Sequence, residues 1–179
     1  MLLWNSEAVT IEIIGSTEQE IHAVVKVPNS NSSWLLSAIY SNLRPCERLI
    51  LWDNLKNVYD GCALPWLAMG DFNEILSESE NFGGGLVNFN RSLKFSDMLN
   101  SCHLSDLGFS GPRFTWTNLR DAGGLVQERL DRAVANPSWR LTFPNAEVAH
   151  LPRVHSDHCP ILRTFNPVTQ TPFTSPLPV

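Results

Sequence analysis

Acidic and amide side chains follow directly on an apolar segment at WLAMGDFNEI, residues 66 to 75. Trp66 to Met69 form a short apolar run bounded by Gly70, which is typical of a strand buried on both faces. Asp71 and Asn73 come next, two residues apart. The plain explanation is a turn in which these side chains bond the nearby backbone. The alternative is that both lie at the mouth of a sheet, where open α/β proteins bind their ligands.

A second group of ionisable residues stands at HSDHCP, residues 155 to 160, directly before another apolar segment. Three explanations remain open on the residues alone. His155, Asp157 and His158 could bind a metal ion, although two histidines at this spacing in a turn rarely form a site by themselves. One histidine could act as a catalytic acid or base beside an acidic neighbour. The segment could also be a solvated loop.

Two further positions could contribute to the same chemistry. In ERLDR, residues 128 to 132, a strand would turn Leu130 to one face and both Arg129 and Asp131 to the other. Such a charged face is usually exposed to solvent, but a carboxylate there could instead orient an imidazole. Tyr40 ends the apolar segment WLLSAIY, where it could pack against the core or donate its hydroxyl to a phosphate oxygen.

The segments that must position these residues alternate between strands and helices. Alternating apolar segments joined by polar turns predict an antiparallel meander over 9–14, 21–27 and 34–40. Further strands are expected at 65–70, 113–117, 126–134, 146–151 and 159–165, with a helical turn at 137–140. Together with two longer helices, these strands favour a layered α/β protein with mixed sheets.

The two longer helices are predicted from their apolar stripes and their end signals. The first runs over 45–60, with Pro45 at its start and Gly61 as its stop. The second runs over 88–101. The residues expected on their inner faces are Leu49, Trp52, Leu55 and Tyr59 in the first helix, and Phe89, Leu93 and Met98 in the second.

Composition indicates one intracellular globular domain. The chain has 179 residues, 43% of them hydrophobic and 17% charged, which excludes a disordered protein. No apolar run approaches the roughly 20 residues that span a membrane. Its four cysteines form no CxxC pair, so neither a zinc site nor a disulfide framework is predicted. A net charge of −5 gives no basic footprint for nucleic acid, but a local basic groove can exist on an acidic protein.

The order of the motifs resembles the endonuclease/exonuclease/phosphatase superfamily, which includes deoxyribonuclease I and the apurinic endonucleases. Tyr40 at a strand end is followed by GDFN (70–73), FTWTN (114–118), RLDR (129–132) and SDHCPI (156–161). The stretches AIYSNLRPCERLILWDNL, NEILSESENFGG, LSDLGFSGPRFTWTN and RLDRAVANPSW look like the endonuclease domain of plant LINE-type (non-LTR) retrotransposons. The resemblance covers residues 1–165, and the proline-rich segment 166–179 is expected to be a disordered tail.

The resemblance implies a four-layer α/β sandwich of two packed mixed sheets flanked by helices. It implies Mg²⁺-dependent hydrolysis of a phosphodiester, with DNA as the partner, nicking as the reaction, and the nucleus as the location of a functional protein. No membrane and no obligate protein partner are expected.

Each motif residue receives a role from this resemblance. Asp71 would orient or deprotonate the attacking water, and Asn73 would hold that water and the phosphate. Asp131 would pair with His158, whose imidazolium would stabilise the phosphate. The remaining residues would contact the phosphate (Tyr40), bind the metal (Asp157) or lie along the DNA backbone (Thr115 and Ser156).

The chain departs from the family pattern before Tyr40. Members carry an early Asn strand and then a strand ending in a Q-E-T-like motif, whose Glu is the main metal ligand, and nothing before Tyr40 matches either one. We therefore expect a domain that lacks its first strands and whose nuclease activity is impaired, with Glu74 or Glu78 as the first candidates for a substitute ligand. Two alternatives are a catalytically inactive remnant that binds nucleic acid or protein weakly, and a phosphomonoesterase of the same superfamily.

Overall fold

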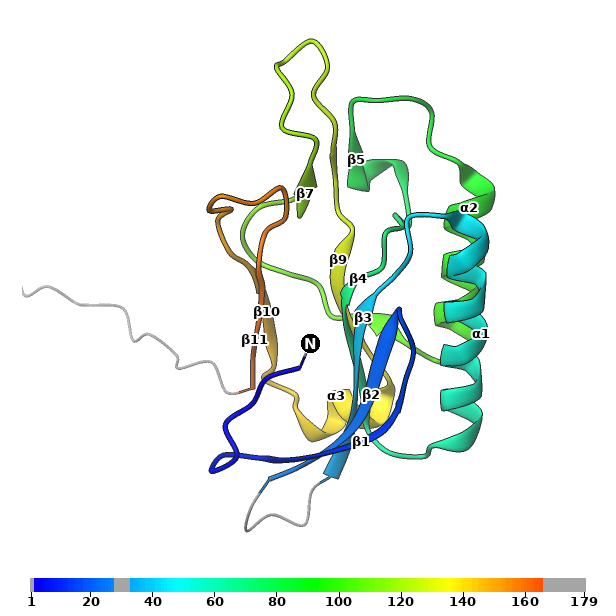
Figure 1. Cartoon of the computed structure of the whole chain (residues 1–179), viewed down its shortest axis with the longest axis vertical. Helices are drawn as coiled ribbons and strands as arrows, with labels where there is room; N and C mark the ends of the chain where they lie inside the picture. The colour runs from blue at the N-terminus through cyan, green and yellow to red at the C-terminus, as the bar shows by residue number, and fades with distance from the viewer. Residues whose placement is uncertain (1, 28–32, 166–179) are drawn as a thin grey trace, which may run out of the picture.

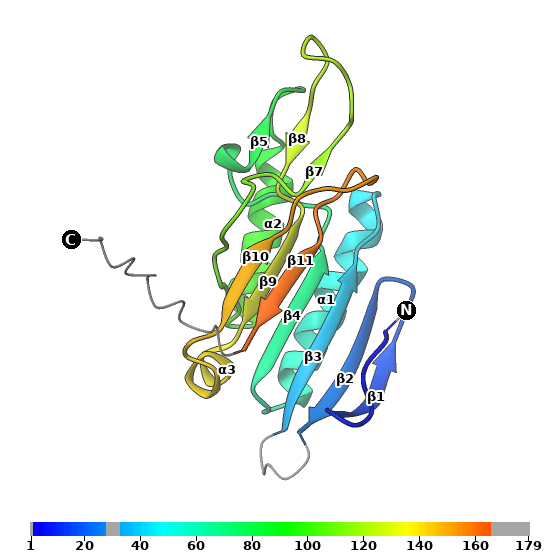
Figure 2. The ribbon, with the colours of Figure 1, turned by 90° about the vertical axis from the view of Figure 1, so that its left-hand side faces the viewer.

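The computed structural model describes residues 2–27 and 33–165 of the chain. A six-stranded mixed sheet runs through its centre (Figure 1, Figure 2). In spatial order, its strands are β1 (Thr10–Ser16), β2 (Glu20–Lys26), β3 (Ser33–Tyr40), β4 (Trp66–Asp71), β9 (Asp131–Ala135) and β6 (Ser105–Asp106). Strands β1 to β3 pair antiparallel, so the predicted meander is confirmed. Strands β3 and β4 are parallel, with α1 as the crossover between them.

The large sheet is covered on both faces. Helices α1 (Pro45–Gly61) and α2 (Phe89–Ser101) pack on one face, and a small sheet of β10 (Glu147–His150) and β11 (Ile161–Thr164) lies against the other (Figure 1). The short helix α3 (Pro137–Thr142) follows β9. The predicted fold class, a layered α/β protein with packed sheets and flanking helices, is confirmed; the smaller sheet is antiparallel rather than mixed.

A third sheet extends from the same end of the molecule at which β4 ends and β9 begins. It consists of β5 (Asn81–Phe82), β8 (Gln127–Glu128) and β7 (Trp116–Thr117), preceded by the 3-10 helix η1 (Glu78–Glu80). All pairs in this sheet are antiparallel. This small sheet and the loops around it stand above the strand ends that carry the motif residues (Figure 2).

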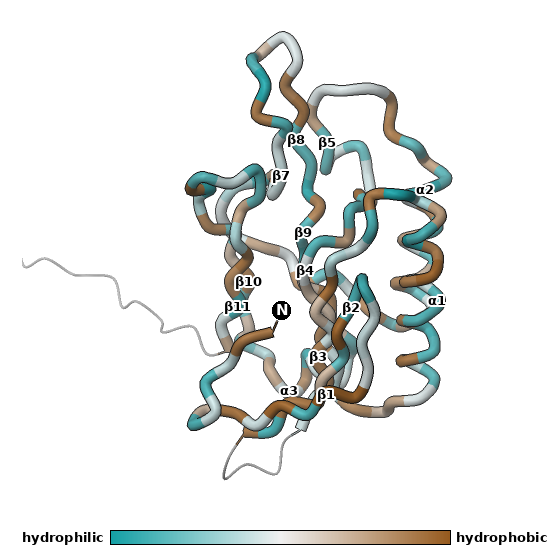
Figure 3. Tube along the Cα trace, in the orientation of Figure 1, coloured by the Kyte–Doolittle hydropathy of each residue, from teal (hydrophilic) through white to brown (hydrophobic). Residues whose placement is uncertain are grey.

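Apolar packing forms a core on each face of the large sheet. On the helical face, Trp52, Phe72 and Phe95 stack on one another among buried Leu and Met side chains. On the opposite face, Trp34 and Trp139 pack beneath β10 and β11. Hydrophobic segments accordingly run along β10, β11 and the strands that face them (Figure 3). Two cores hold the sheet rigid, which fixes the positions of its strand ends.

The helices begin and end close to the predicted positions, but their inner faces are rotated from those predicted. In α1 the buried residues are Arg48, Leu51, Trp52 and Leu55, whereas Leu49 is exposed. In α2 they are Ser92, Phe95, Met98 and Leu99, whereas Phe89 and Leu93 are exposed. Each face still follows the spacing of three and four residues. Trp52, Leu55 and Met98 are buried as predicted, whereas the predicted positions that are exposed failed because hydrophobicity alone counted exposed apolar residues and ignored buried polar ones.

The segment predicted as one strand over 126–134 is two strands. Strand β8 ends at Glu128 and β9 begins at Asp131, because Arg129 and Leu130 leave the ladder. The alternation assumed across this break does not hold: Arg129 binds Glu80 and Asp106, while Asp131 binds His158. Strand β7 is also shorter than the predicted 113–117.

The remaining predictions concern the chain's ends and membranes. The predicted tail 166–179 and nearly all of the loop between the second and third strands lie outside the described residues. None of the helices described has both the length and the apolar character needed to cross a membrane.

Candidate active site

Strand register brings three of the predicted site residues to one edge of the large sheet. Asp71, the last residue of β4, is paired with Tyr40 at the end of β3 and with Asp131 at the start of β9. Strands β3 and β4 run to this edge and β9 runs away from it, so the three positions are neighbours although far apart in sequence. Gly70 permits this approach, since its φ is 137° and a Cβ there would lie 2.1 Å from the carbonyl oxygen of Ile39.

Asp71 and Asn73 form a turn, and that turn is also part of the site. The backbone N–H of Asn73 donates to Asp71 Oδ1 at 2.8 Å. The side-chain Nδ2 of Asn73 donates to Asp71 Oδ2 at 2.9 Å. The same Nδ2 donates to the carbonyl of Ser41 at 2.8 Å. Asn73 has a φ of 49°, a left-handed conformation that Asn adopts more readily than most residues. Both explanations offered for this motif therefore hold together.

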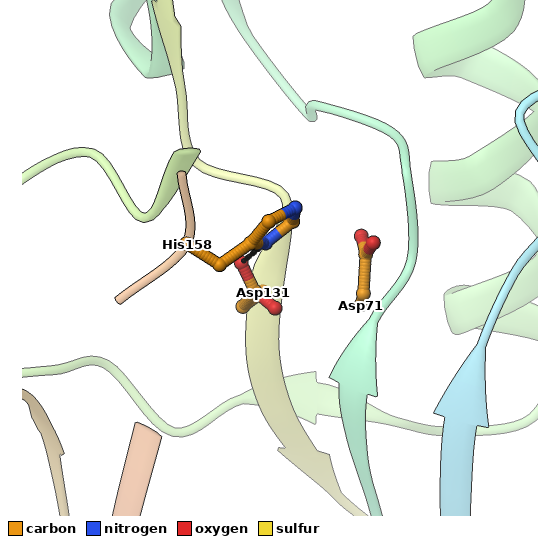
Figure 4. A group of neighbouring side chains, drawn as sticks. All are labelled: Asp71, Asp131 and His158. Atoms are coloured by element: carbon orange, nitrogen blue, oxygen red, sulfur yellow. Dashed lines mark hydrogen bonds and ion pairs between the residues drawn. The ribbon is translucent and has the colours of Figure 1, made fainter. Parts of the chain in front are cut away.

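Asp131 and His158 form a hydrogen-bonded pair. His158 Nδ1 lies 2.8 Å from Asp131 Oδ2, and Asp71 faces the pair from the neighbouring strand end (Figure 4). The hydrogen bond to Asp131 raises the pKa of His158 against the opposing effect of burial, and the charge of Asp131 raises it further. The expected proximity of the two residues is thus confirmed.

The loop that carries His158 is fixed by the strand beside it. Trp116 and His158 form an antiparallel bridge, and the N–H of Thr117 donates to the carbonyl of Asp157 at 3.0 Å. Trp116 Nε1 donates to Asp157 Oδ2 at 3.1 Å. Ser156 Oγ accepts from the N–H of His158 at 3.1 Å. The HSDH segment is therefore an ordered turn with a defined imidazole position.

Thr115 does not have the place expected for a DNA contact. Its side chain is completely buried, and its Oγ1 accepts from the N–H groups of Leu130 and Asp131 at 2.9 and 3.0 Å. Leu130 lies in the break between β8 and β9, and Asp131, which is paired with Asp71, is the first residue after that break. Thr115 is thus a positioning residue for Asp131, and the sequence-based role is corrected.

One cleft of about 400 Å³ collects most of the predicted residues. Tyr40, Asp71, Asn73, Asp157 and His158 all line it. Ser156 is exposed and lines a neighbouring hollow with His155, so a metal site built on both histidines does not fit the structure.

The carboxyl group of Asp71 is buried and has a raised pKa. Burial raises the pKa of Asp71 to about 6, and the nearby charge of Asp131 adds to this effect, while hydrogen bonding by Asn73 and the charge of His158 oppose it. A carboxyl group that titrates near neutrality can exchange a proton with a bound water at physiological pH.

The donor set at this edge fits a divalent cation. Among the described residues, Asp71, Asp131 and His158 form a group whose possible ligand atoms all lie within 4.8 Å of one another. The two carboxylates repel each other there, as the raised pKa of Asp71 shows, and a cation would relieve that repulsion. Asp157, the metal residue expected from the sequence, lies outside this group but lines the same cleft.

Three charged residues of the cleft, Arg48, Arg91 and Glu128, were missed from the sequence. Glu74 Oε2 accepts from Arg48 Nη2 at 2.8 Å and from Arg91 Nε at 2.9 Å, and both arginines line the cleft, as does Glu128. Glu74 is therefore engaged by two guanidinium groups and is not a free substitute ligand, and Glu78 is exposed and does not line the cleft. An arginine on the buried stripe of α1 was the available signal, because a buried charge needs a partner.

Comparisons with known proteins give structural matches. No protein-family model matches the sequence, and no curated protein matches it. The structure is similar to the endonuclease domain of TRAS1, a telomere-specific non-LTR retrotransposon, at 16% identity and a TM-score of 0.69, covering 88% of this chain and 68% of that one. It is also similar to D. rerio TDP2 complexed with single-strand DNA product, at 15% identity and a TM-score of 0.52, covering 86% of this chain and 64% of that one.

A third match carries the superfamily's name. It is an endonuclease/exonuclease/phosphatase family protein from Bacteroides thetaiotaomicron, at 12% identity and a TM-score of 0.51, covering 84% of this chain and 64% of that one. This chain has the endonuclease/exonuclease/phosphatase fold. Within that fold, Asp71, Asn73, Asp131 and His158 meet at a single edge of the large sheet.

Proposed function

We propose that this chain is a nuclease-type domain that hydrolyses phosphodiester bonds in DNA with the help of a divalent cation. The observation that carries the proposal is the cleft in which a buried carboxyl group, an amide and a carboxylate–imidazole pair converge on the endonuclease/exonuclease/phosphatase fold. Hydrolysis of this ester needs a group that activates water and a group that stabilises charge on phosphate. The cleft supplies both.

Each residue has a role that its hydrogen bonds allow. Asp71 orients the attacking water and takes its proton. Both N–H groups of the Asn73 amide are used within the protein, so its Oδ1 is left to accept from the water. Asp131 holds the imidazole of His158, and the protonated ring donates to a phosphate oxygen. Tyr40 is largely exposed at the rim of the cleft, where its hydroxyl can reach the phosphate.

Asp71 and Asp131 are the residues proposed to hold the cation, with Asp157 as a further candidate. Mg²⁺ prefers carboxylate and water oxygens, which is the chemistry of this donor set. When bound, such an ion would neutralise charge on the phosphoryl group. His158 Nδ1 is already occupied by Asp131, so we do not assign it as a ligand.

We also propose that cleavage by this chain is slow. Within the described residues, no glutamate belongs to the group formed by Asp71, Asp131 and His158. Too few hard ligands give weak Mg²⁺ binding. The loss of one charge-stabilising group costs about a hundred- to a thousandfold in rate, so we expect a deficit of at least that size against the TRAS1 domain.

The origin we propose is a plant LINE-type non-LTR retrotransposon, and the place of action of a functional protein is the nucleus. Two observations support this origin. The FTWTN and GFSGPRF stretches resemble that branch of the superfamily. The TM-score of 0.69 to the TRAS1 domain is also higher than those to the TDP2 and Bacteroides proteins.

A nicking assay on supercoiled plasmid tests the activity. The purified chain is incubated with Mg²⁺ or with chelator, beside the variants Asp71→Asn and His158→Ala. His103→Ala is the matched control, because His103 is exposed and does not line the cleft. We expect slow nicking that chelator and both site variants abolish and the control retains. Nicking by the wild-type chain that is no faster than nicking by His158→Ala would contradict the nuclease activity. It would favour a catalytically inactive remnant that binds nucleic acid or protein.

A further inference from the structure

A second hollow adjoins the catalytic cleft between the first turns of α1 and α2. It has a volume of about 350 Å³, and Arg48 and Arg91 line both this hollow and the cleft. Lys94 completes its set of basic side chains. We name this hollow the interhelix pocket; its other lining residues are Pro45, Cys46, Leu49, Trp52, Glu74, Asn88 and Asn90.

The interhelix pocket is positively charged on an acidic protein. Arg48, Arg91 and Lys94 supply three positive charges and Glu74 supplies one negative charge, which leaves a net charge of +2. The chain as a whole has a net charge of −5. Because exposed charges farther apart than about 10 Å are largely screened at physiological salt, a ligand in this pocket responds to the local charge.

The arginines of the pocket have different tasks. Arg48 is 2% exposed, and its Nη1 donates to the carbonyls of Asn42 and Leu43 while its Nη2 donates to Glu74. These hydrogen bonds hold the guanidinium group of Arg48 in place beside the carboxylate of Glu74. Arg91 is 40% exposed and uses only Nε to bind Glu74. In the described part of the chain, its two terminal nitrogens have no hydrogen-bond partner, so a planar fork of N–H donors is held in place and open to solvent.

The backbone adds a donor to the same pocket. Helix α1 has no side-chain cap at Arg44, and among the described residues the N–H of Cys46 has no acceptor. Asn88 caps α2 by accepting from the N–H of Arg91, which places that residue in the first helical turn. The pocket therefore combines an exposed ammonium group, a guanidinium group held by Glu74 and one backbone N–H donor. Tetrahedral oxyanions bind such a combination.

We propose that the interhelix pocket binds a backbone phosphate of the nucleic acid whose scissile phosphate lies in the adjoining cleft. Arg91 stands at the shared wall and contacts this second phosphate, Lys94 adds charge from the next turn of α2, and Glu74 is a positioning residue for Arg91. The inference rests on the proposed function, since it takes the same polynucleotide as ligand. It assigns the pocket a role in affinity and placement of the strand.

The opposing charge is Glu128, which lines the cleft together with Arg91. Glu128 does not line the interhelix pocket, so its carboxylate disfavours a phosphate in the cleft next to Arg91 more than one in the pocket. The two hollows thus differ in charge balance: the cleft sets the two arginines against Asp71, Glu128 and Asp157, whereas in the pocket Glu74 alone opposes three basic side chains.

Binding without cleavage tests the pocket. A fluorescein-labelled DNA duplex is titrated in chelator, and its anisotropy is followed from 50 to 300 mM salt for wild type, Arg91→Met and Lys94→Ala. Lys94 is exposed, so its variant is expected to fold, and circular dichroism checks both. Lys56→Ala is the matched control, because Lys56 is a partly exposed lysine on α1 that does not line the pocket.

We expect each pocket variant to weaken binding about three- to tenfold and to lower the salt slope by about one, as the loss of one phosphate contact does. The control keeps the wild-type values. The phosphate-binding role of the pocket is overturned if Lys94→Ala and Arg91→Met bind DNA as well as the control does. It is also overturned if the wild-type chain does not bind DNA.

Parallel nicking assays separate this proposal from the proposed function. Weakened binding in the pocket variants together with no nicking by wild type supports the pocket and removes the nuclease activity. Unchanged binding in the variants together with nicking by wild type removes the pocket and keeps the nuclease.

Discussion

The carboxyl group of Asp71 lies in the cleft proposed as the active site, but its burial there lowers the stability of the fold. Its side chain is 7% exposed and lies beside a second carboxylate, Asp131. The ionised form loses hydration on folding, and only the Asn73 donors and nearby cations compensate for this loss. Keeping such a group costs stability, and this cost is what the proposed role of Asp71 as a proton acceptor would explain.

The cost at Asp71 is measurable as a pH dependence of stability. Its pKa is about 6 in the folded chain and its ordinary value is 3.8, so the folded state binds more protons between these values and stability falls as pH rises through them. Relative to Asp71→Asn, we expect the free energy of unfolding of wild type to fall by about 1–3 kcal/mol between pH 4 and pH 7. Urea unfolding in chelator measures this difference. The control is Asp121→Asn, which changes an exposed carboxyl group and should show no such trend. A difference between wild type and Asp71→Asn that does not change with pH would refute the raised pKa of Asp71.

The Asp131–His158 pair predicts a loss of stability in the same direction, at higher pH. The pKa of His158 is raised, so its contribution to stability is present below the ordinary value of 6.5 and is lost as pH rises through the folded value. The variant Asp131→Asn changes the hydrogen-bond partner that is the largest cause of the raised pKa of His158. We therefore expect NMR titration of this variant to show a lower pKa for His158. Asp157→Asn should lower it less, since the charge of Asp157 is the smallest of the contributing causes. Equal shifts in the two variants would count against the pair.

At the scale of elements, the break between β8 and β9 is the feature that creates the site. If 126–134 were one continuous strand, Asp131 and Arg129 would share a face. The break allows Arg129 to reach Glu80 and Asp106 while Asp131 begins a new strand opposite Asp71. The hydroxyl of Thr115 accepts two backbone N–H groups at this point.

Thr115→Val removes that acceptor with little change in shape. Two buried N–H groups then lack a partner, and we expect the free energy of unfolding to fall by about 1–3 kcal/mol. The release of Asp131 should also lower the pKa of His158 towards its ordinary value. Thr115→Ser keeps the hydroxyl and is the control. Thermal unfolding and NMR titration measure both effects, and identical behaviour of Val and Ser at this position would show that the hydroxyl has no such role.

At the scale of the whole molecule, a buried ionic network joins parts of the chain that are distant in sequence. Arg129 and Arg132 each bind both Glu80 and Asp106, which connects η1 with β6 and β9. Arg132 is fully buried and lies over the ring of Phe95 at the helical core. The network fixes the loop after Asn73 against the sheet, so it supports the cleft from below.

The same network predicts the response of the fold to acid. Burial alone would raise the pKa of Glu80 and Asp106, but hydrogen bonds and charge from the arginines outweigh burial and lower both. This stabilisation is present above the ordinary pKa values, 4.5 for Glu80 and 3.8 for Asp106. It is lost as pH falls through the lower pKa values that the two groups have in the folded chain.

Glu80→Gln tests this response. We expect it to destabilise the fold by about 3–5 kcal/mol at pH 7, because it leaves buried charge unpaired, and by less near pH 3. Chemical unfolding at the two pH values measures this, with exposed Glu78→Gln as the control. The same deficit at both pH values would show that Glu80 acts through packing alone.

The sequence by itself determined most of the strands and the order of the motif residues that lie at their ends. Alternating apolar residues predicted the strands of the large sheet, because a strand's side chains alternate between faces whatever lies around them. Motif order then singled out Asp71, Asn73, Asp131 and His158. These are local or sequential properties, and the chain carries them without any need for folding.

Tertiary structure alone decided how the residues meet and what surrounds them. Strand register placed Asp71 opposite Asp131, and two cores set the rotation of α1 and α2, which made Arg48 a buried ion-pair partner and left Leu49 exposed. The burial of Thr115 and the pairing of Glu74 with Arg48 and Arg91 also depend on contacts across many residues. Such contacts depend on packing between elements, and a polar residue's burial and charge state follow from its partners rather than from its own type.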